Sequence, residues 1–515
     1  MDLRVQAWNN PMPWQGGRWS LRDIVDYDYA AMMAALNNVA RYRDIWLHNF
    51  YAIGKRAVSE TRRPFAYLVP QEQRDPITAT ELLQVMRTAQ VEVNETTNEV
   101  TIDGVRYPVG TRVIYTAQPY GAFAKTMLEV QHYPDLRLYP GGPPKPPYDV
   151  TAHSLPLQMG VHAVEVQQPF DAQVKPVDQI QVPTGRVIGR SQGTSQVYLL
   201  GAETNASSWA VNRLLDSGAQ VSRIRSAVTV DEQRYETGTY VIEGGRKVTS
   251  LVDSMAAQNG LVFHTAPETL SISLWRLRPP RVGLYKSWAP TTEEGWTRWI
   301  FEEYQFPYTT LVDTDIRQGH LEDRFDAVVL PHQPVQQVHD GNSPNDYPPE
   351  YAGGLGELGG MHLRRFVEAG GTLITWDGTT DYAIRYLDLP VTNVVAGLPN
   401  TDFYAPGSFF RVLLDITHPI AYGMPQRTPV VFQHSSVFDV RQGTVVGKYP
   451  MNNLLLSGWV LGQHRLFGQS ALVEVPVGRG RVILIGFKVH FRAQARGTYR
   501  ILFNSMFHSS ASVQE

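Results

Sequence analysis

The sequence of 515 residues contains no cysteine. This absence excludes disulfide bonds, thiolate nucleophiles and cysteine-based metal sites. Long apolar runs are also missing, because the longest, around Val482 to Phe487, is strand-sized and well below the ~20 residues of a membrane helix. The start, "MDLRVQAWNN", lacks a basic segment followed by an apolar stretch, so no signal peptide is visible.

An excess of charge of one sign is absent as well. The formal net charge is −3, and no dense block of lysine and arginine occurs. We therefore expect neither a nucleic-acid nor a membrane partner. The content of 43% hydrophobic and 18% charged residues is typical of a globular protein. The length predicts roughly three to four domains.

The first segment, residues 1–62, combines a connector with a helix. "NNPMPWQGGRW" is rich in proline and glycine and is typical of a connector. From about Asp26 to Ser59, apolar residues recur at helical intervals without an internal proline. This pattern predicts one long helix.

An internal repeat follows. "FAYLVP", "ELLQVMRTAQVEV" and "RYPVGTRVIY" have the same order as "VYLLG", "NRLLDSGAQVSRI" and "RYETGTYVIE". Tyr67 corresponds to Tyr198 at an offset of 131, and Gly110 corresponds to Gly238 at an offset of 128. Near-constant offsets indicate duplication of one unit. The sequence therefore predicts two small α/β modules, at residues 63–135 and 191–279, packed as a pair.

A proline-rich segment, residues 136–190, separates the two copies. "YPGGPPKPPYDVTAHSLPLQMG" contains too much proline for a helix and too many apolar residues for a free linker. We expect this strap to be pinned across the surface of the pair, where it could line a cleft.

Residues 280–515 alternate strands with helices. "RVGLYKSWAPTTEEGWTRWIFEEY" and "GGMHLRRFVEAGGTLITWDG" join strands to amphipathic helices, and "LVEVPVGRGRVILIGF" has a hairpin pattern. This alternation predicts a doubly wound parallel sheet. The predicted fold class is thus α/β, with a long N-terminal helix, two repeated modules and a C-terminal doubly wound domain of amidotransferase or flavodoxin type.

Several blocks carry a family resemblance. "PWQGGRWSLRDIVDY", "PYGAFAKTMLEVQHYPD", "PYDVTAHSLPLQMG", "YAGGLGELG" and "GFKVHFRAQARGTYRILFNS" together resemble the C-terminal portion of large bacterial zinc carboxypeptidase-like proteins. The third unit is similar to class I glutamine amidotransferase-like domains. The resemblance implies a secreted or periplasmic protein, and it implies that this chain is a fragment or a free-standing descendant of a larger one.

The chemistry implied by the resemblance has no counterpart in these residues. The zinc-binding His-x-x-Glu of such peptidases, with its later histidine, would lie outside these blocks. His162 and Glu165 have that spacing, but their strand pattern directs them to opposite faces of a sheet. An amidotransferase needs a cysteine at a strand-to-helix elbow, and the segment considered for it, "AGGLGELGG", offers only Glu357. We therefore expect no metal and no cofactor.

Two functions remain open. The favoured one is a non-catalytic binding or accessory region that takes a peptide or carbohydrate ligand, because aromatic side chains beside a few charges suit such ligands. The ligand-binding candidates are Lys286, Trp288, Trp296, Arg298, Tyr351 and Asp149. The alternative is a hydrolase of glycosidase or peptidase/amidase type that uses carboxylates or histidine at a cleft between domains. Its catalytic candidates are Glu350, Glu357, Glu294 and His153. A homo-oligomer is left open.

Overall fold

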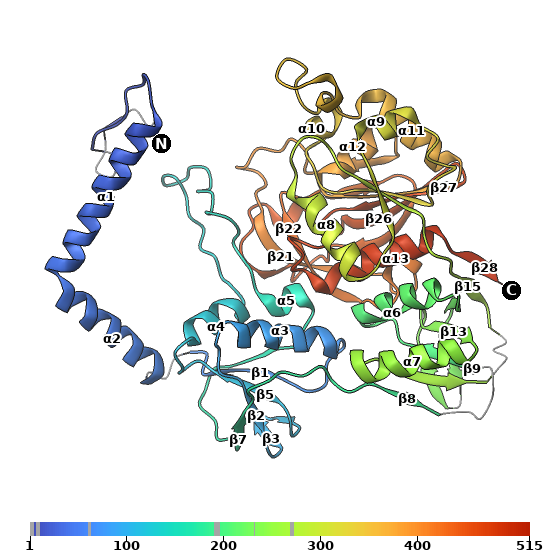
Figure 1. The fold of residues 1–515 in the computed structure, drawn as a ribbon, viewed down its shortest axis with the longest axis horizontal. Coiled ribbons are helices and arrows are strands. Elements are labelled where there is room, and N and C mark those ends of the chain that lie inside the picture. Colours follow the sequence, from blue (N-terminus) through green and yellow to red (C-terminus); the bar gives the residue numbers. More distant parts are fainter. Residues whose placement is uncertain are drawn as a thin grey trace.

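The computed structural model describes residues 5–6, 11–59, 63–189, 196–230, 232–267 and 272–514. Three α/β bodies lie together, and a helical arm at the N-terminal end projects away from them (Figure 1). The predicted α/β class is confirmed. None of the described helices combines the length and apolar character that crossing a membrane requires.

The arm consists of α1 (Leu21–Arg41) and α2 (Arg43–Ser59). The Ser20 N–H donates to Asp23 Oδ2 at 2.7 Å and thereby caps the first turn of α1. The predicted single helix is wrong in one respect, because it is broken at Tyr42, whose φ is −115° and ψ 26°. No residue of either helix is buried, so the break occurs where no packing holds the backbone.

The first body follows the predicted order of the repeat. A strand, a helix, a strand, a hairpin and a final strand occur in turn, and the sheet has the order β6-β1-β5-β2-β7. The final strand β5 pairs antiparallel with both β1 and β2. These elements are β1 (Ala66–Val69), α3 (Pro76–Thr88), β2 (Asn94–Thr96), β3 (Val100–Ile102), β4 (Val105–Tyr107), β5 (Arg112–Tyr115), α4 (Gly121–Leu128), α5 (Leu155–Met159), β6 (Val164–Val166) and β7 (Val174–Pro176).

The second body repeats this topology, as the duplicated landmarks predict. Its last repeated strand, β13, again lies between the first and second strands, β9 and β10, and is antiparallel to both. Its sheet, in the order β28-β15-β10-β13-β9-β14-β8, also takes in a strand from the end of the chain. The elements are β8 (Arg186–Ile188), β9 (Gln196–Leu200), α6 (Asn205–Asp216), β10 (Gln220–Ile224), β11 (Val228–Val230), β12 (Gln233–Tyr235), β13 (Tyr240–Gly244), α7 (Arg246–Asn259), β14 (Val262–Ala266), β15 (Leu274–Arg276) and β28 (Ser512–Gln514).

The proline-rich strap is pinned, and it lies against both the first module and the third body. The Thr151 N–H donates to the Gly407 carbonyl at 2.8 Å. Ala152 packs with Phe409 and Val431 in a small apolar cluster. Leu155 and Met159 of the strap pack instead in the core of the first module. The strap therefore joins the first module to the C-terminal sheet.

The third body is one large sheet that is parallel in one half and antiparallel in the other. Strands β17, β16, β18, β19 and β27 run parallel, as predicted. β26 pairs antiparallel with β27, as the hairpin pattern predicts. The antiparallel pairing of β26, β24, β21 and β22 beyond it was not predicted from sequence. The parallel strands are β16 (Val282–Tyr285), β17 (Tyr308–Leu311), β18 (Ala327–Leu330), β19 (Thr372–Trp376) and β27 (Gly480–Ile485). The others are β20 (Val391–Asn393), β21 (Pro406–Leu414), β22 (Arg427–Gln433), β23 (Phe438–Val440), β24 (Thr444–Lys448), β25 (Leu455–Ser457) and β26 (Ser470–Val477).

Helices connect and cover these strands (Figure 1). Gly370, with φ 118°, follows α11 and lets the chain turn into β19, as predicted for a helix stop. The helices are α8 (Thr292–Glu303), α9 (Asp313–Gln318), α10 (Val335–Asp340), α11 (Gly356–Glu368), α12 (Gly378–Tyr386) and α13 (Tyr499–Ser509), with short 3₁₀ turns η1 (Pro349–Tyr351), η2 (Pro419–Ala421), η3 (Gln463–Arg465) and η4 (Arg496–Thr498).

Candidate functional site

The turn from β19 into α12 has the backbone of a nucleophile elbow. Asp377 occupies it with φ 58° and ψ −126°, a conformation that side-chain-bearing residues adopt at a cost of about 1–3 kcal/mol. A Cβ on the next residue, Gly378, would meet the Gln333 carbonyl at 2.5 Å. The elbow therefore lies at Asp377. The segment considered from sequence, "AGGLGELGG", instead bridges to Asn342 at Gly353 and then forms the first turn of α11.

The Asp377 carboxylate is fully buried and lies against a lysine. Lys488, in the segment after β27, places Nζ 2.7 Å from Asp377 Oδ2. His332 Nδ1 lies 3.2 Å from the same oxygen, but it accepts a hydrogen bond from the Gly378 N–H at 3.0 Å. That acceptance requires an unprotonated Nδ1, and burial lowers the pKa of His332. Lys488 is therefore the charged partner of Asp377.

A second carboxylate and a second histidine complete the group. Glu293 Oε1 lies 3.7 Å from Lys488 Nζ, and Glu293 Oε2 lies 3.5 Å from His490 Nε2. The Thr297 hydroxyl donates to the Glu293 carbonyl and so accepts from His490 Nε2 at 3.0 Å. Burial lowers the pKa of His490 to about 4. The His490 ring is therefore neutral at pH 7. Lys488 is then the one cation of this group beside the carboxylates of Asp377 and Glu293.

We name Asp377, Glu293, Lys488 and His490 the elbow cluster. Its members lie at the carboxyl-end side of the parallel strands or on α8, where ligands of α/β folds gather. Of the four, only Glu293 belongs to a carboxylate pair, with Asp313, that the sequence leaves open for glycosidase-type chemistry. Asp377, Lys488 and His490 were not predicted from sequence. The signal that could have found them is the polar residue directly after a buried strand, in "TLITWDG" and "VILIGFKVHF".

Three of the predicted ligand-binding residues do come together. The Lys286 Nζ lies 5.7 Å from the centre of the Trp288 ring, and Trp288 meets Tyr351 edge-to-face at 4.8 Å. Trp288 Nε1 is buried without a hydrogen-bond partner among the described residues. Glu350 is exposed beside Tyr351 in η1. We call Lys286, Trp288 and Tyr351 the aromatic cluster.

The other predicted residues lie in separate pairs. Glu294 is ion-paired with Arg298 one turn along α8, and Trp296 is exposed on that helix. Asp149 on the strap pairs with Arg492 at 2.7 Å. The remaining two candidates are His153, whose backbone N–H donates to Gln131, and Glu357, which is exposed at the start of α11.

The His162–Glu165 pair lies at β6, and neither residue has a third ligand beside it. Across the described ranges, no three histidine, aspartate or glutamate side chains are grouped so that they could share one metal ion. Glu165 instead accepts a hydrogen bond from Gln167.

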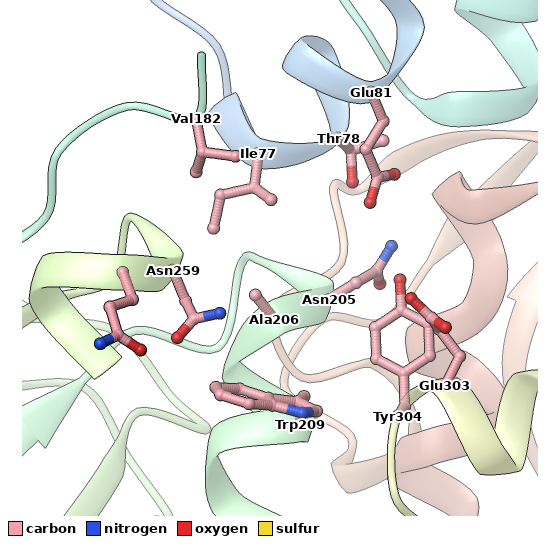
Figure 2. Close-up of a pocket in the computed structure, with 11 residues that line it drawn as sticks. Ile77, Thr78, Glu81, Val182, Asn205, Ala206, Trp209, Asn259, Glu303 and Tyr304 are labelled. Carbon is pink, nitrogen blue, oxygen red and sulfur yellow. The ribbon is translucent and has the colours of Figure 1, made fainter. Parts of the chain in front are cut away.

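A pocket of about 180 Å³ lies where the two repeated modules meet the C-terminal body (Figure 2). α3 contributes Glu81 and Thr78 on one side, and α6 contributes Asn205 and Trp209 on the other. The remaining lining residues are Ile77, Val182, Ala206, Gln258, Asn259, Glu303 and Tyr304. We call it the junction pocket. No local sequence pattern indicates it, because its walls come from segments far apart in the chain.

Polar groups in the junction pocket are only partly satisfied. Asn205 is 2% exposed; its Nδ2 donates to the Arg496 carbonyl at 2.9 Å, but its Oδ1 receives no hydrogen bond from the described residues. Glu81 lies 2.6 Å from Arg496 Nε. Burial raises the pKa of Glu81, and Arg496 opposes that rise. The pocket therefore combines a free acceptor, two carboxylates and one indole face.

No protein-family model matches the sequence. No curated protein matches it either. Several solved structures are similar to somewhat less than half of the chain. A β-galactosidase from Bacillus circulans sp. alkalophilus has 11% identity and a TM-score of 0.26, over 44% of this chain and 31% of that chain. The match thus spans about a third of the length of the galactosidase.

Two smaller proteins are similar over most of their own length. A ThuA-like protein from Bacteroides uniformis has 10% identity and a TM-score of 0.29, over 45% of this chain and 91% of that one. A protein described as part of a GMP synthase, from Thermoplasma acidophilum, has 9% identity and a TM-score of 0.28, over 44% and 94%. Likeness at this level carries no argument about function.

Proposed function

We propose that this chain is a binding or accessory region whose amidotransferase-like domain has no catalytic role of its own. The observation that supports it is the state of the elbow: Asp377 is fully buried and ion-paired with Lys488. A nucleophile has to be approached by its substrate, whereas this carboxylate faces a cation inside the protein. The proposal agrees with the resemblance to the C-terminal part of zinc carboxypeptidase-like proteins, which implies a role beside a separate catalytic domain.

The ligand that we propose for the junction pocket is a carbohydrate, with a peptide as the alternative. Trp209 offers an apolar ring face, and Asn205, Asn259 and Gln258 offer planar amides. Sugar hydroxyls donate to free acceptors such as Asn205 Oδ1 while their C–H faces lie on aromatic rings. The volume of about 180 Å³ suits a single small unit of such a ligand rather than a long chain.

Binding can be tested by NMR titration or calorimetry of the whole chain with individual monosaccharides and, separately, short peptides. We expect saturable binding of a sugar that is weakened at least tenfold by Trp209→Ala. Trp299→Ala is the matched control, because Trp299 is 39% exposed on α8 outside the pocket. Equal loss in both variants, or saturation by peptides only, would contradict the carbohydrate proposal.

A hydrolase is the second candidate, and the elbow cluster is the observation that favours it. Two carboxylates, a lysine and a neutral histidine lie together at the ligand-binding edge of an α/β sheet. Such groups can serve as nucleophile or acid–base catalysts once a substrate reaches them.

Chromogenic glycosides, esters and aminoacyl amides distinguish the two candidates. Turnover abolished by Asp377→Asn but retained in Glu350→Gln and Glu357→Gln would establish the elbow cluster as an active site. Turnover abolished by Glu350→Gln or Glu357→Gln would instead support the catalytic residues predicted from sequence. We expect the unsubstituted chain to turn over none of these substrates, so that none of the substitutions changes the result.

A further inference from the structure

The N-terminal arm carries a stripe of apolar side chains with a seven-residue period. Val25, Met32, Val39, Trp46 and Ile53 follow one another at intervals of seven. A further large apolar residue lies four positions after Val25, Met32 and Trp46. These residues are Tyr29, Leu36 and Phe50, respectively. The spacing alternates between four and three residues except for the single step of seven from Val39 to Trp46, and this is the pattern of a helix that packs against another helix. We call these eight residues the arm seam.

The arm seam is uncovered. Its side chains are between 48% and 82% exposed, with Val25 the least and Phe50 the most. α2 contacts the body at α4, and Figure 1 shows α1 standing apart from the three bodies. Eight such side chains expose on the order of 800 Å², which is about what each partner contributes to a standard protein interface. Most helical stability in proteins comes from the packing of an apolar face, so a partner on the arm seam would stabilise α1 and α2.

The charges along the arm indicate what that partner is. The start of α1 carries Asp23, Asp26 and Asp28 against one arginine, Arg22. The part after the seam's midpoint has the opposite sign, with Arg41, Arg43, Lys55 and Arg56 against one aspartate, Asp44. A second arm laid antiparallel on the first places each acidic end beside a basic end. A parallel pair would place like charges together.

We propose that the arm seam is a dimerisation surface on which the arm of a second copy of this chain packs antiparallel. A two-fold axis beside Arg41 places α1 of the first copy on α2 of the second copy. By the same symmetry it places α2 of the first copy on α1 of the second. The break at Tyr42 fits this arrangement, because the axis passes through it and each helix meets only one partner helix. The dimer surface is remote from the junction pocket, so this inference does not depend on the proposed function.

The absence of cysteine allows the arrangement to be tested by cross-linking. The axis beside Arg41 sets Tyr29, twelve residues before it, opposite Ile53 of the partner subunit, twelve residues after it. Within one arm, about 18 Å of helix separates each position from the break, so an intramolecular disulfide with its Cα spacing of about 4.4–6.8 Å cannot form. We expect Tyr29→Cys/Ile53→Cys to give a covalent dimer under mild oxidation. Tyr29→Cys alone should remain uncrosslinked, and efficient cross-linking of this single variant would mean a parallel pair and overturn the proposal.

Mass measurement by analytical ultracentrifugation provides the independent readout. We expect the full chain to sediment at twice 57.9 kDa at micromolar concentration. Leu36→Glu should shift it to the monomer, whereas Asn37→Glu, which adds the same charge next to the seam, should leave the dimer intact. Both variants should keep the thermal transition of the body, because α1 buries no residue. A wild-type chain that is monomeric at micromolar concentration, or a dimer unaffected by Leu36→Glu, overturns the proposal.

Discussion

Asp75 joins the two repeated modules by accepting hydrogen bonds from both of their first helices. Its Oδ1 accepts from the Thr78 N–H of α3 at 3.0 Å, and its Oδ2 accepts from the Asn205 N–H at the start of α6, also at 3.0 Å. Arg500, at the start of α13 in the third body, lies 3.5 Å from the same Oδ2. One carboxylate therefore neutralises the positive ends of two helices and a buried guanidinium.

We predict that Asp75→Ala lowers the free energy of unfolding by about 3–5 kcal/mol, because the substitution removes two helix-terminal acceptors and leaves Arg500 buried without its carboxylate. Asp75→Asn should cost less, since the amide oxygen can still accept from one helix. Chemical denaturation followed by circular dichroism measures both. Asp346→Ala is the control, as Asp346 is exposed. A cost for Asp75→Ala as small as that of the control would mean that the modules are held together by other contacts.

The elbow cluster predicts an order of destabilisation. Lys488→Met leaves Asp377 and Glu293 buried without a cation, and we expect it to cost about 3–5 kcal/mol of stability. Asp377→Asn should cost less, because Lys488 keeps Glu293 at 3.7 Å. Lys175→Met removes one of the two cations paired with Glu95 and leaves Arg112 in place; because Lys175 is 61% exposed, the substitution should cost less than about 1 kcal/mol. Thermal and denaturant unfolding of the three variants measures how much stability each loses. The prediction is contradicted if Lys175→Met loses the most.

Stability should fall on acidification, and His490 is one cause. Burial lowers the pKa of His490 to about 4, whereas in the unfolded chain the pKa returns to its ordinary value of 6.5. Between these values the unfolded chain binds the proton and the folded one does not. The contribution is therefore fully present above about pH 6.5 and is lost as pH falls towards about 4, by roughly 3 kcal/mol in all.

Asp381 has the opposite effect on the pH dependence of stability in part of the same pH range. Burial raises its pKa from 3.8 to about 6, so its unfavourable ionisation is relieved as pH falls below about 6. We predict that His490→Gln flattens the decline of unfolding free energy between pH 6.5 and 4, and that Asp381→Asn steepens it. Denaturant titrations at half-unit pH steps measure both slopes. Unchanged slopes in both variants would show that other groups set the pH dependence.

The aromatic cluster offers a second place where a ligand predicted from sequence could bind. Trp288 lies between Lys286 and Tyr351, with its Nε1 free to donate. We predict that Trp288→Ala weakens binding of a saturating sugar or peptide severalfold if the ligand extends to this cluster. Trp296→Ala is the control, because Trp296 is similarly aromatic but stands alone on the outer face of α8 at 40% exposure. Calorimetry with both variants decides this, and identical affinities exclude the cluster from the ligand site.

Local sequence patterns were sufficient for much of the fold. The hairpin β26–β27 and the stop at Gly370 were each predicted from signals that lie within about twenty residues. The duplicated strand–helix–strand order was predicted from such local signals recurring at a near-constant offset along the chain. Such signals act through backbone propensity, turn chemistry and the alternation of apolar residues, which need no distant partner. The single long helix was wrong at Tyr42, where neither proline nor glycine marks the break.

The candidate site depended on contacts that no local pattern contains. Asp377, Lys488 and Glu293 are distant in sequence, and they meet only because β16, β19 and β27 are brought into one parallel sheet. In the same way, the junction pocket exists only where α3 and α6 approach each other through Asp75. The sequence by itself determined the elements, their repeat and the absence of thiol chemistry. Only the tertiary structure decided which polar groups share a buried site, because burial removes water and makes each charge depend on the particular side chains packed beside it.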